Sequence, residues 1–166
     1  MISDKEIQYT NTLEALERWA GIIIDEYKKR LSYAGNDKGE LYNTISFSHI
    51  DKTGAFFIIN INVANYFWYY EHGRRAGKWP PIDKIFQWVV KKNIIPRPLT
   101  LKTGKTIIPT QKTLAFLIAR SIGKHGTRPH PLFSDTVTHL REAMVESISE
   151  ALARDLETEI DIKITI

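Results

Sequence analysis

The sequence lacks cysteine, and it lacks any long apolar run. Without cysteine the chain has neither a disulfide framework nor a thiolate metal site. No apolar run approaches the ~20 residues that a membrane-spanning helix needs. The start of the chain, Met1–Glu6, is polar and has no signal-like apolar segment. We therefore expect a soluble protein that is not secreted and has no membrane partner.

Acidic residues are scarce in the middle of the chain. From Arg74 to Pro131 there are thirteen Lys or Arg residues and one acid, Asp83. The rest of the chain holds ten basic and eighteen acidic residues. The middle therefore carries a formal charge of about +12 and the flanks about −8, an asymmetry that indicates a charged partner surface.

Helical periodicity is present near both ends. Asn11, with Glu14 three positions later, predicts an N-terminal helix whose inward stripe is Leu13, Leu16, Ala20, Ile23, Ile24, Tyr27 and Leu31. Ser134 is the predicted N-cap of a last long helix, with inward residues Val137, Leu140, Met144, Ile148, Leu152 and Leu156. Between them, Pro80-Pro81 opens one helix, and Thr110 caps another that ends near Gly126.

Alternating apolar residues predict strands. Two such runs within residues 41–63 flank a turn at Asp51–Gly54 and predict a hairpin. A smaller basic hairpin is expected as an insertion near residues 96–109. Residues 159–166 alternate strictly, with every Ile on one face. This terminal strand pairs either with the 41–63 hairpin of its own subunit, which we favour, or with a neighbour's sheet edge.

These elements predict the fold class and the domain organisation. We expect a single α+β domain over residues 1–166. A small antiparallel sheet, made of the hairpin 41–63 and the C-terminal strand 159–166, would be packed by the long N- and C-terminal helices.

Two stretches join aromatic or apolar residues to a Gly or Pro and to arginines. The first is Tyr66-Phe67-Trp68-Tyr69-Tyr70-Glu71-His72-Gly73-Arg74-Arg75. Gly73 is expected to take a positive φ and end this aromatic element. The second is Thr127-Arg128-Pro129-His130-Pro131-Leu132-Phe133. There, Pro129 and Pro131 are expected to hold a rigid extended linker that places Phe133 in a core.

Read together, the two stretches resemble the head–tail connector proteins of tailed bacteriophages, also called neck or tail-completion proteins. The resemblance lies in the pattern and the element order between Val63 and Leu156. It implies a structural virion protein, a ring subunit that joins the portal to the tail, with neither enzyme activity nor a cofactor. The implied partners are other copies of the chain and the portal, connector and tail proteins, in the virion and, during assembly, in the host cytoplasm. The resemblance also implies that Glu71 fixes the geometry of the turn, whereas the residues alone allow a surface salt bridge.

The basic middle has three interpretations: contact with DNA phosphates, docking on acidic neighbouring subunits, or an ordinary solvated face. We favour docking, followed by non-specific DNA contact. The candidate partner-binding residues are Arg74, Arg75, Lys78, Lys102 and Lys105. The consecutive aromatic residues either reach a subunit interface or pack on both sides of one corner.

The histidines offer a less favoured alternative, a small metal-dependent hydrolase or nuclease. Glu71, His72, His125 and His130 would have to converge for such a site. None of them has the His-Glu-x-x-His spacing on one helix, and no nucleophile elbow is present. We therefore expect no catalytic, metal or cofactor-binding residues.

Overall fold

The computed structural model describes residues 8–36, 39–54 and 56–159. Its elements confirm the α+β class and the long helices near both ends. In chain order they are α1 (Thr10–Tyr33), α2 (Glu40–Thr44), β1 (Ser46–Thr53), β2 (Phe56–Asn62), α3 (Phe67–His72), α4 (Ile82–Lys91), β3 (Leu99–Thr100), β4 (Thr106–Ile107), α5 (Gln111–His125) and α6 (Leu132–Glu159). In the predicted terminal strand 159–166, Glu159 is the last residue of α6, and the remainder lies outside the described residues.

The chain divides into two compact units, a division that the prediction of a single domain over residues 1–166 did not anticipate. The first unit combines Met1–Phe67 with Pro131–Ile166, and the second is Trp68–His130. Periodicity shows which face of an element is apolar, but it does not show which faces share a core.

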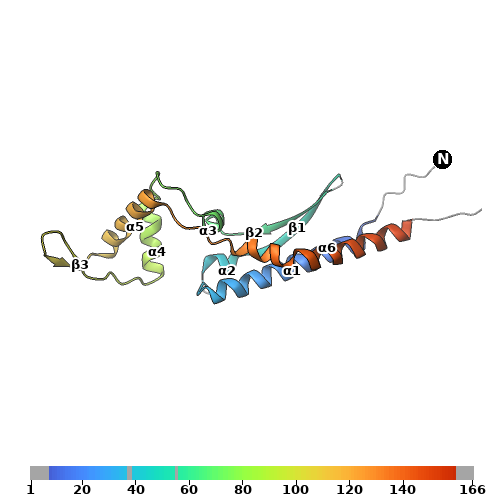
Figure 1. Ribbon diagram of the computed structural model, residues 1–166, viewed down its shortest axis with the longest axis horizontal. Coiled ribbons are helices and arrows are strands. Elements are labelled where there is room, and N and C mark those ends of the chain that lie inside the picture. Colours follow the sequence, from blue (N-terminus) through green and yellow to red (C-terminus); the bar gives the residue numbers. More distant parts are fainter. Residues whose placement is uncertain (1–7, 37–38, 55, 160–166) are drawn as a thin grey trace, which may run out of the picture. The chain divides into compact units, whose positions relative to one another are not determined.

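In the first unit, α1 and α6 form an antiparallel pair (Figure 1). Asn11, at the start of α1, contacts Asp155 near the end of α6. Tyr27, on the last turns of α1, contacts Phe133 at the start of α6, with ring centroids 5.4 Å apart. These two contacts hold the helix pair near both of its ends.

Asp155 caps α1 from another helix. Its carboxylate accepts hydrogen bonds from the backbone N–H groups of Asn11 (2.9 Å) and Thr12 (2.8 Å). It also accepts from Asn11 Nδ2 (2.7 Å) and Thr12 Oγ1 (2.6 Å). The positive end of the helix dipole favours a carboxylate at this place. The predicted N-cap is therefore wrong: α1 begins at Thr10, so Asn11 lies in its first turn and donates to the capping group instead of supplying it.

Burial and hydrogen bonding shift the pKa of the Asp155 carboxyl in opposite directions. The residue is 1% exposed, and burial by itself raises the pKa of its carboxyl. The hydrogen bonds from Thr12 and Asn11 outweigh that effect and lower the pKa from 3.8 to about 2. The folded chain therefore favours the ionised carboxylate.

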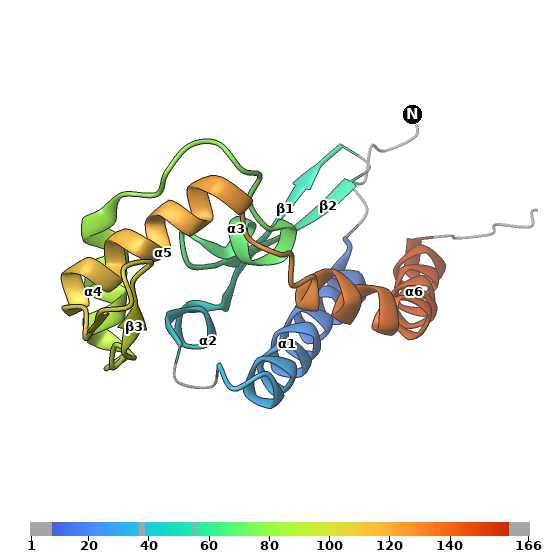
Figure 2. The same ribbon diagram turned by 60° about the vertical axis from the view of Figure 1, so that its left-hand side comes forward.

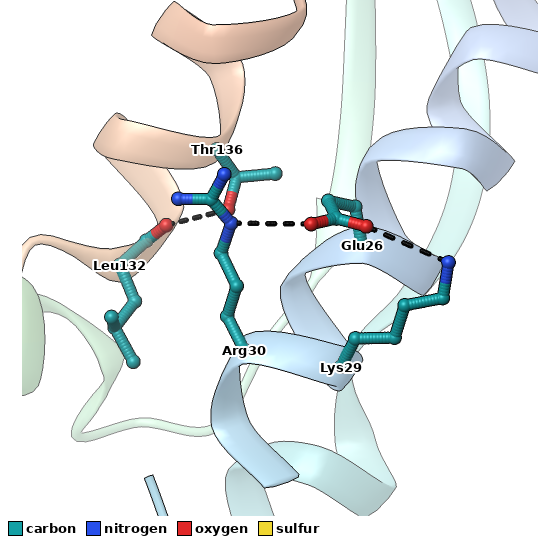
Figure 3. A network of polar contacts seen from close by, with 5 residues as sticks. All are labelled: Glu26, Lys29, Arg30, Leu132 and Thr136. Atoms are coloured by element: carbon teal, nitrogen blue, oxygen red, sulfur yellow. Dashed lines mark hydrogen bonds and ion pairs between the residues drawn. The ribbon is translucent and has the colours of Figure 1, made fainter. Parts of the chain in front are cut away.

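The α1–α6 contact includes small and polar residues. Thr136 is fully buried, and its hydroxyl donates to the carbonyl of Leu132 at 2.6 Å. Figure 3 shows this residue beside the α1 side chains Glu26 and Arg30, whose carboxylate and guanidinium lie 3.4 Å apart. Because α6 begins at Leu132, the predicted N-cap Ser134 is also wrong, since it lies inside the first turn. Among the described side chains of α6, Thr136, Ala151 and Asp155 are buried. Of the predicted inward residues, Leu156 is 38% exposed, and the others are half-buried: Val137, Leu140, Met144, Ile148 and Leu152.

The first hairpin is shorter than predicted, since residues 41–44 belong to α2 and the paired strands span Ser46–Thr53 and Phe56–Asn62. The antiparallel register pairs Phe47 with Ile61 and Ile50 with Ile59, and it shifts between Phe47 and His49. The extra residue of such a bulge changes the phase of the alternation. It therefore brings Ile50, three residues after Phe47, onto the same partly buried face.

Three aromatic rings meet beneath the start of α6. Tyr27 is fully buried, and its ring lies edge-on to Phe67 at 6.4 Å and to Phe133 at 5.4 Å. Phe67 and Phe133 are 5.5 Å apart. Edge-to-face contacts of this kind add to the free energy gained by apolar burial. The prediction that Phe133 reaches the main core is confirmed.

In the second unit α4 and α5 lie side by side (Figure 2). Val89 of α4 is fully buried, as are Ala115 and Ala119 of α5. The predicted cap of α5 is confirmed, because Thr110 Oγ1 accepts from the Thr113 N–H at 3.2 Å. Between α4 and α5, strands β3 and β4 pair as a small antiparallel hairpin within the predicted 96–109 insertion.

We predict that replacing Asp155 with Ala lowers the free energy of unfolding of the first unit by about 2–3 kcal/mol, because four donors lose a charged acceptor. Denaturant titration measures this change. The matched control is Glu150→Ala, an exposed carboxylate on the same helix, which should cost no more than about 0.5 kcal/mol. Equal losses in the two variants would contradict the capping role.

The lowered pKa of Asp155 also predicts a pH dependence. Its stabilising contribution is fully present above the unfolded pKa, near 3.8, and is lost as the pH falls toward about 2. The stability difference between wild type and Asp155→Asn should therefore shrink over that interval. A difference that stays constant from pH 5 to about pH 2 would show that the carboxylate is not preferentially ionised in the folded state.

We predict that Phe133→Ala destabilises the first unit by about 3 kcal/mol, the lower end of the range for a Phe→Ala change, because the ring is only partly covered. Phe133→Leu keeps most of the apolar volume and should cost no more than about 1.5 kcal/mol. Thermal and denaturant unfolding test both variants. A loss below about 1 kcal/mol for the Ala variant would mean that the ring contacts contribute little.

Candidate functional site

The two stretches that carry the phage resemblance lie where the chain passes between the units, at 67/68 and again at 130/131. In the second unit they pair with each other. The Arg74 N–H donates to the Thr127 carbonyl at 3.1 Å, and the Thr127 N–H donates to the Arg74 carbonyl at 2.8 Å. We call residues 66–75 and 127–133 the crossover segments. The structure thus brings together residues that are more than fifty positions apart in the sequence.

The two prolines limit the backbone hydrogen bonds that the second crossover segment can donate. Neither Pro129 nor Pro131 has an N–H, so His130 supplies the only backbone donor of the three. That N–H donates to the Tyr70 carbonyl at 2.9 Å, and the His130 ring stacks on the Tyr70 ring at 5.2 Å. Pro131 directly precedes α6, and its carbonyl accepts from the Asp135 N–H at 2.9 Å.

Gly73 is required by both its conformation and its neighbours. Its φ is +70°, which confirms the predicted positive value. A Cβ at this position would lie 2.5 Å from the Thr127 carbonyl oxygen and 2.8 Å from the Pro129 nitrogen. The close approach of the two crossover segments therefore depends on the absence of a side chain here.

Glu71 lies two residues before this glycine and is 2% exposed. The surface salt-bridge interpretation is therefore wrong. Carboxylates are rarely buried unless they are paired, which supports a structural role for Glu71 at the turn.

The aromatic residues of α3 divide between covered and exposed positions. Phe67 and Tyr70 pack against rings of their own units. Trp68 is 64% exposed and stacks on His72, with ring centroids 3.9 Å apart, and Tyr69 is 55% exposed. The interior-packing interpretation thus holds for Phe67 and Tyr70, and an interface role for the exposed rings stays a prediction.

The candidate basic residues form two separate groups. Arg74 is partly buried: its Nη2 donates to the Lys78 carbonyl at 2.8 Å, and its guanidinium lies 5.6 Å from the Tyr69 ring centroid. Arg74 therefore supports the loop after α3, while Arg75 and Lys78 are exposed. Both Lys102 and Lys105 are exposed on the turn that joins β3 to β4.

The charge asymmetry of the sequence follows the division into units. The second unit contains thirteen Lys or Arg and two acids, a formal charge of +11. The remaining residues contain ten bases and seventeen acids, a formal charge of −7. Charge of one sign is therefore concentrated on a separate folded unit.

An exposed aromatic pair on the second unit was not predicted as a site. Trp79 and Phe116 have ring centroids 5.7 Å apart and are 45% and 41% exposed. The Trp79 ring lies so close to α5 that a Cβ on Gly123 would be 2.6 Å from its Nε1. The glycine inside the apolar α5 pattern was the sequence signal for this close packing.

The candidate histidine site does not assemble. His72 stacks on Trp68, His125 Nδ1 lies 3.2 Å from the Ser121 carbonyl of its own helix, and His130 stacks on Tyr70. Within the described ranges, no three His, Asp or Glu side chains are grouped as metal ligands would be. No helix in the described part of the chain is both long and apolar enough to cross a membrane.

Comparison with known proteins finds no matching family model, no matching curated protein and no matching solved structure.

We predict that Gly73→Ala disrupts the crossover pairing, because the new Cβ meets backbone atoms of the other segment. Gly104→Ala is the matched control: its φ is +78°, but no atom lies within 4 Å of a Cβ at that position. The control should lose about 1 kcal/mol from backbone strain, and Gly73→Ala clearly more. Amide hydrogen exchange at Arg74 and Thr127 reports the pairing, and unchanged protection in Gly73→Ala would contradict the packing argument.

Proposed function

We propose that this chain is a structural subunit of a ring at the neck or tail terminus of a tailed bacteriophage, where it joins the portal or connector to the tail. The observation that carries the proposal is the pairing of the two crossover segments. The two stretches that resemble the phage connector proteins carry the chain from one unit to the other, and within the second unit they pair with each other. The partners of such a subunit are other copies of the chain and the portal, connector and tail proteins. It would act in the virion and, during assembly, in the host cytoplasm.

Exposed aromatic side chains and a basic unit support an assembly role. Trp and Tyr are enriched at protein interfaces because each combines a large apolar area with a polar group. Trp68 and Tyr69 offer such area beside the crossover. The concentration of positive charge on one unit favours docking on an acidic protein surface.

The direct test is to delete the gene from the phage or prophage that carries it and to image the particles. We expect heads and tails that are not joined, and joined particles again when the wild-type chain is supplied from a plasmid. Normal joined particles without the chain would refute the proposal.

Non-specific nucleic-acid binding is the second candidate, favoured by the +11 charge of the second unit. Binding through phosphates would weaken steeply with salt. Titration of duplex and single-stranded DNA at several salt concentrations tests this function. An affinity that barely changes with salt would exclude phosphate contacts as its main source.

The turn between β3 and β4 generates a further prediction. Replacing both Lys102 and Lys105 with Glu should change the free energy of unfolding by no more than about 0.5 kcal/mol, because both side chains are exposed. Joining of heads and tails should nevertheless decrease when this variant is the only copy supplied. Lys91→Glu with Lys92→Glu makes the same charge change at the exposed end of α4 and serves as the control. Normal particles with the turn variant would rule out a contact role for this turn.

A further inference from the structure

An aromatic–basic face lies on α5 of the second unit. Phe116 is four residues from both Lys112 and Arg120, so the three side chains are neighbours along the helix. Lys124 follows Arg120 at the same spacing, and Trp79, in the loop before α4, contacts Phe116. All five side chains are exposed. We use the term aromatic–basic face for these five residues.

Three of these five residues, Trp79, Phe116 and Arg120, are of types enriched in protein interfaces, whereas lysine is depleted there. Aromatic and Arg anchors contribute most of the binding energy of an interface, and charged residues suit its polar rim. An ordinary solvated helix face would not require the Trp79 ring to be held against Gly123 with nearly half of its surface in water.

A complementary acidic stripe runs along α6 of the first unit. Its residues are all exposed: Asp135, Glu142, Glu146, Glu150 and Glu157. At about 100° per residue, these five positions fall within an arc of about 80° on the helix. Glu150 has an exposed ion pair with Arg154, at 3.5 Å. Arg154 offsets part of the charge of Glu150, and the other four acids are spread over more than twenty residues of the same helix.

We propose that the aromatic–basic face of one copy docks on the acidic stripe of a second copy. The inference rests on the proposed ring and identifies the two surfaces by which neighbouring subunits meet. The two faces carry opposite charge, so each repels its own kind, and a two-fold contact between identical faces is disfavoured. Where two copies make this contact once, it is head-to-tail, and a series of such contacts produces a ring when the rotation between subunits closes.

Crosslinking between isotopically light and heavy copies tests the contact directly. A carbodiimide joins Lys amines to carboxylates without a spacer, so it reports only groups that touch. At low salt we expect light–heavy crosslinks from Lys112 or Lys124 to Glu142, Glu146 or Glu150, and fewer of them at high salt. Crosslinks within single chains only, or none at the highest soluble concentration, would overturn the proposal.

Charge reversal tests it a second way. The face variant carries Arg120→Glu and Lys124→Glu, and the stripe variant carries Glu142→Lys and Glu146→Lys. Each alone should weaken self-association about ten-fold or more in sedimentation experiments, because like charges then oppose each other. Self-association should return in an equimolar mixture of the face variant and the stripe variant. It should also return in one chain that carries all four changes. Lys91→Glu with Lys92→Glu is the control and should associate as wild type does.

The outcomes separate this inference from the proposed function. Failure of the mixture to regain association would overturn the docking surfaces, whether or not particles need the chain. Normal particles without the chain would refute the phage role and leave the self-contact standing. If the face variant associates normally but binds duplex DNA more weakly, the face is a nucleic-acid surface and the proposed docking is wrong.

Discussion

The hydrogen bonds between Asp155 and the start of α1 are the interaction on which the first unit depends most. They join residues about 144 positions apart, with the whole second unit between them in the sequence, so they close a very long loop. With the ring cluster of Tyr27 and Phe133 at the other end, they fix how α1 and α6 align. They also fix which side of α6 faces inward, and therefore which side presents its acids to solvent.

The crossover segments meet a different constraint, since the chain must leave the first unit and return to it close by. Two strands cannot approach so closely where side chains intervene, and Gly73 removes the side chain at the tightest point. Within the Pro-His-Pro sequence of the returning segment, His130 has the one backbone N–H, and the Tyr70 carbonyl accepts from it. Residues that resemble a phage connector pattern thus have a clear physical reason for being together, independent of what the protein assembles with.

The two units carry formal charges of opposite sign. A unit of +11 and a remainder of −7 in one chain would attract the opposite units of other copies and repel like ones. Exposed rings beside the basic residues would add the short-range apolar contact that screened surface charges do not provide. Together they account for why the proposed function and the proposed docking surfaces both concern assembly rather than chemistry.

The sequence alone determined the features that depend on near neighbours: the Thr110 cap, the positive φ of Gly73, the end of α5 at Gly126, the α+β class and the charge asymmetry. The turn at Gly73 and the exposure of Arg75, Lys78, Lys102 and Lys105 were predictable for the same reason, because they depend on local sequence, whereas a partner-binding role for these basic residues stays a prediction. Only the tertiary structure decided the cap of α1, the two units and the buried face of α6. Residues spaced by four, as from Leu140 to Leu156, advance about 40° per step around a helix, so the apolar series turns away from the contact face. The series from Leu140 to Leu152 is half-buried and Leu156 is exposed, whereas the buried positions are Thr136, Ala151 and Asp155. Burial of the two polar residues is favourable because α1 supplies the close packing and the donors.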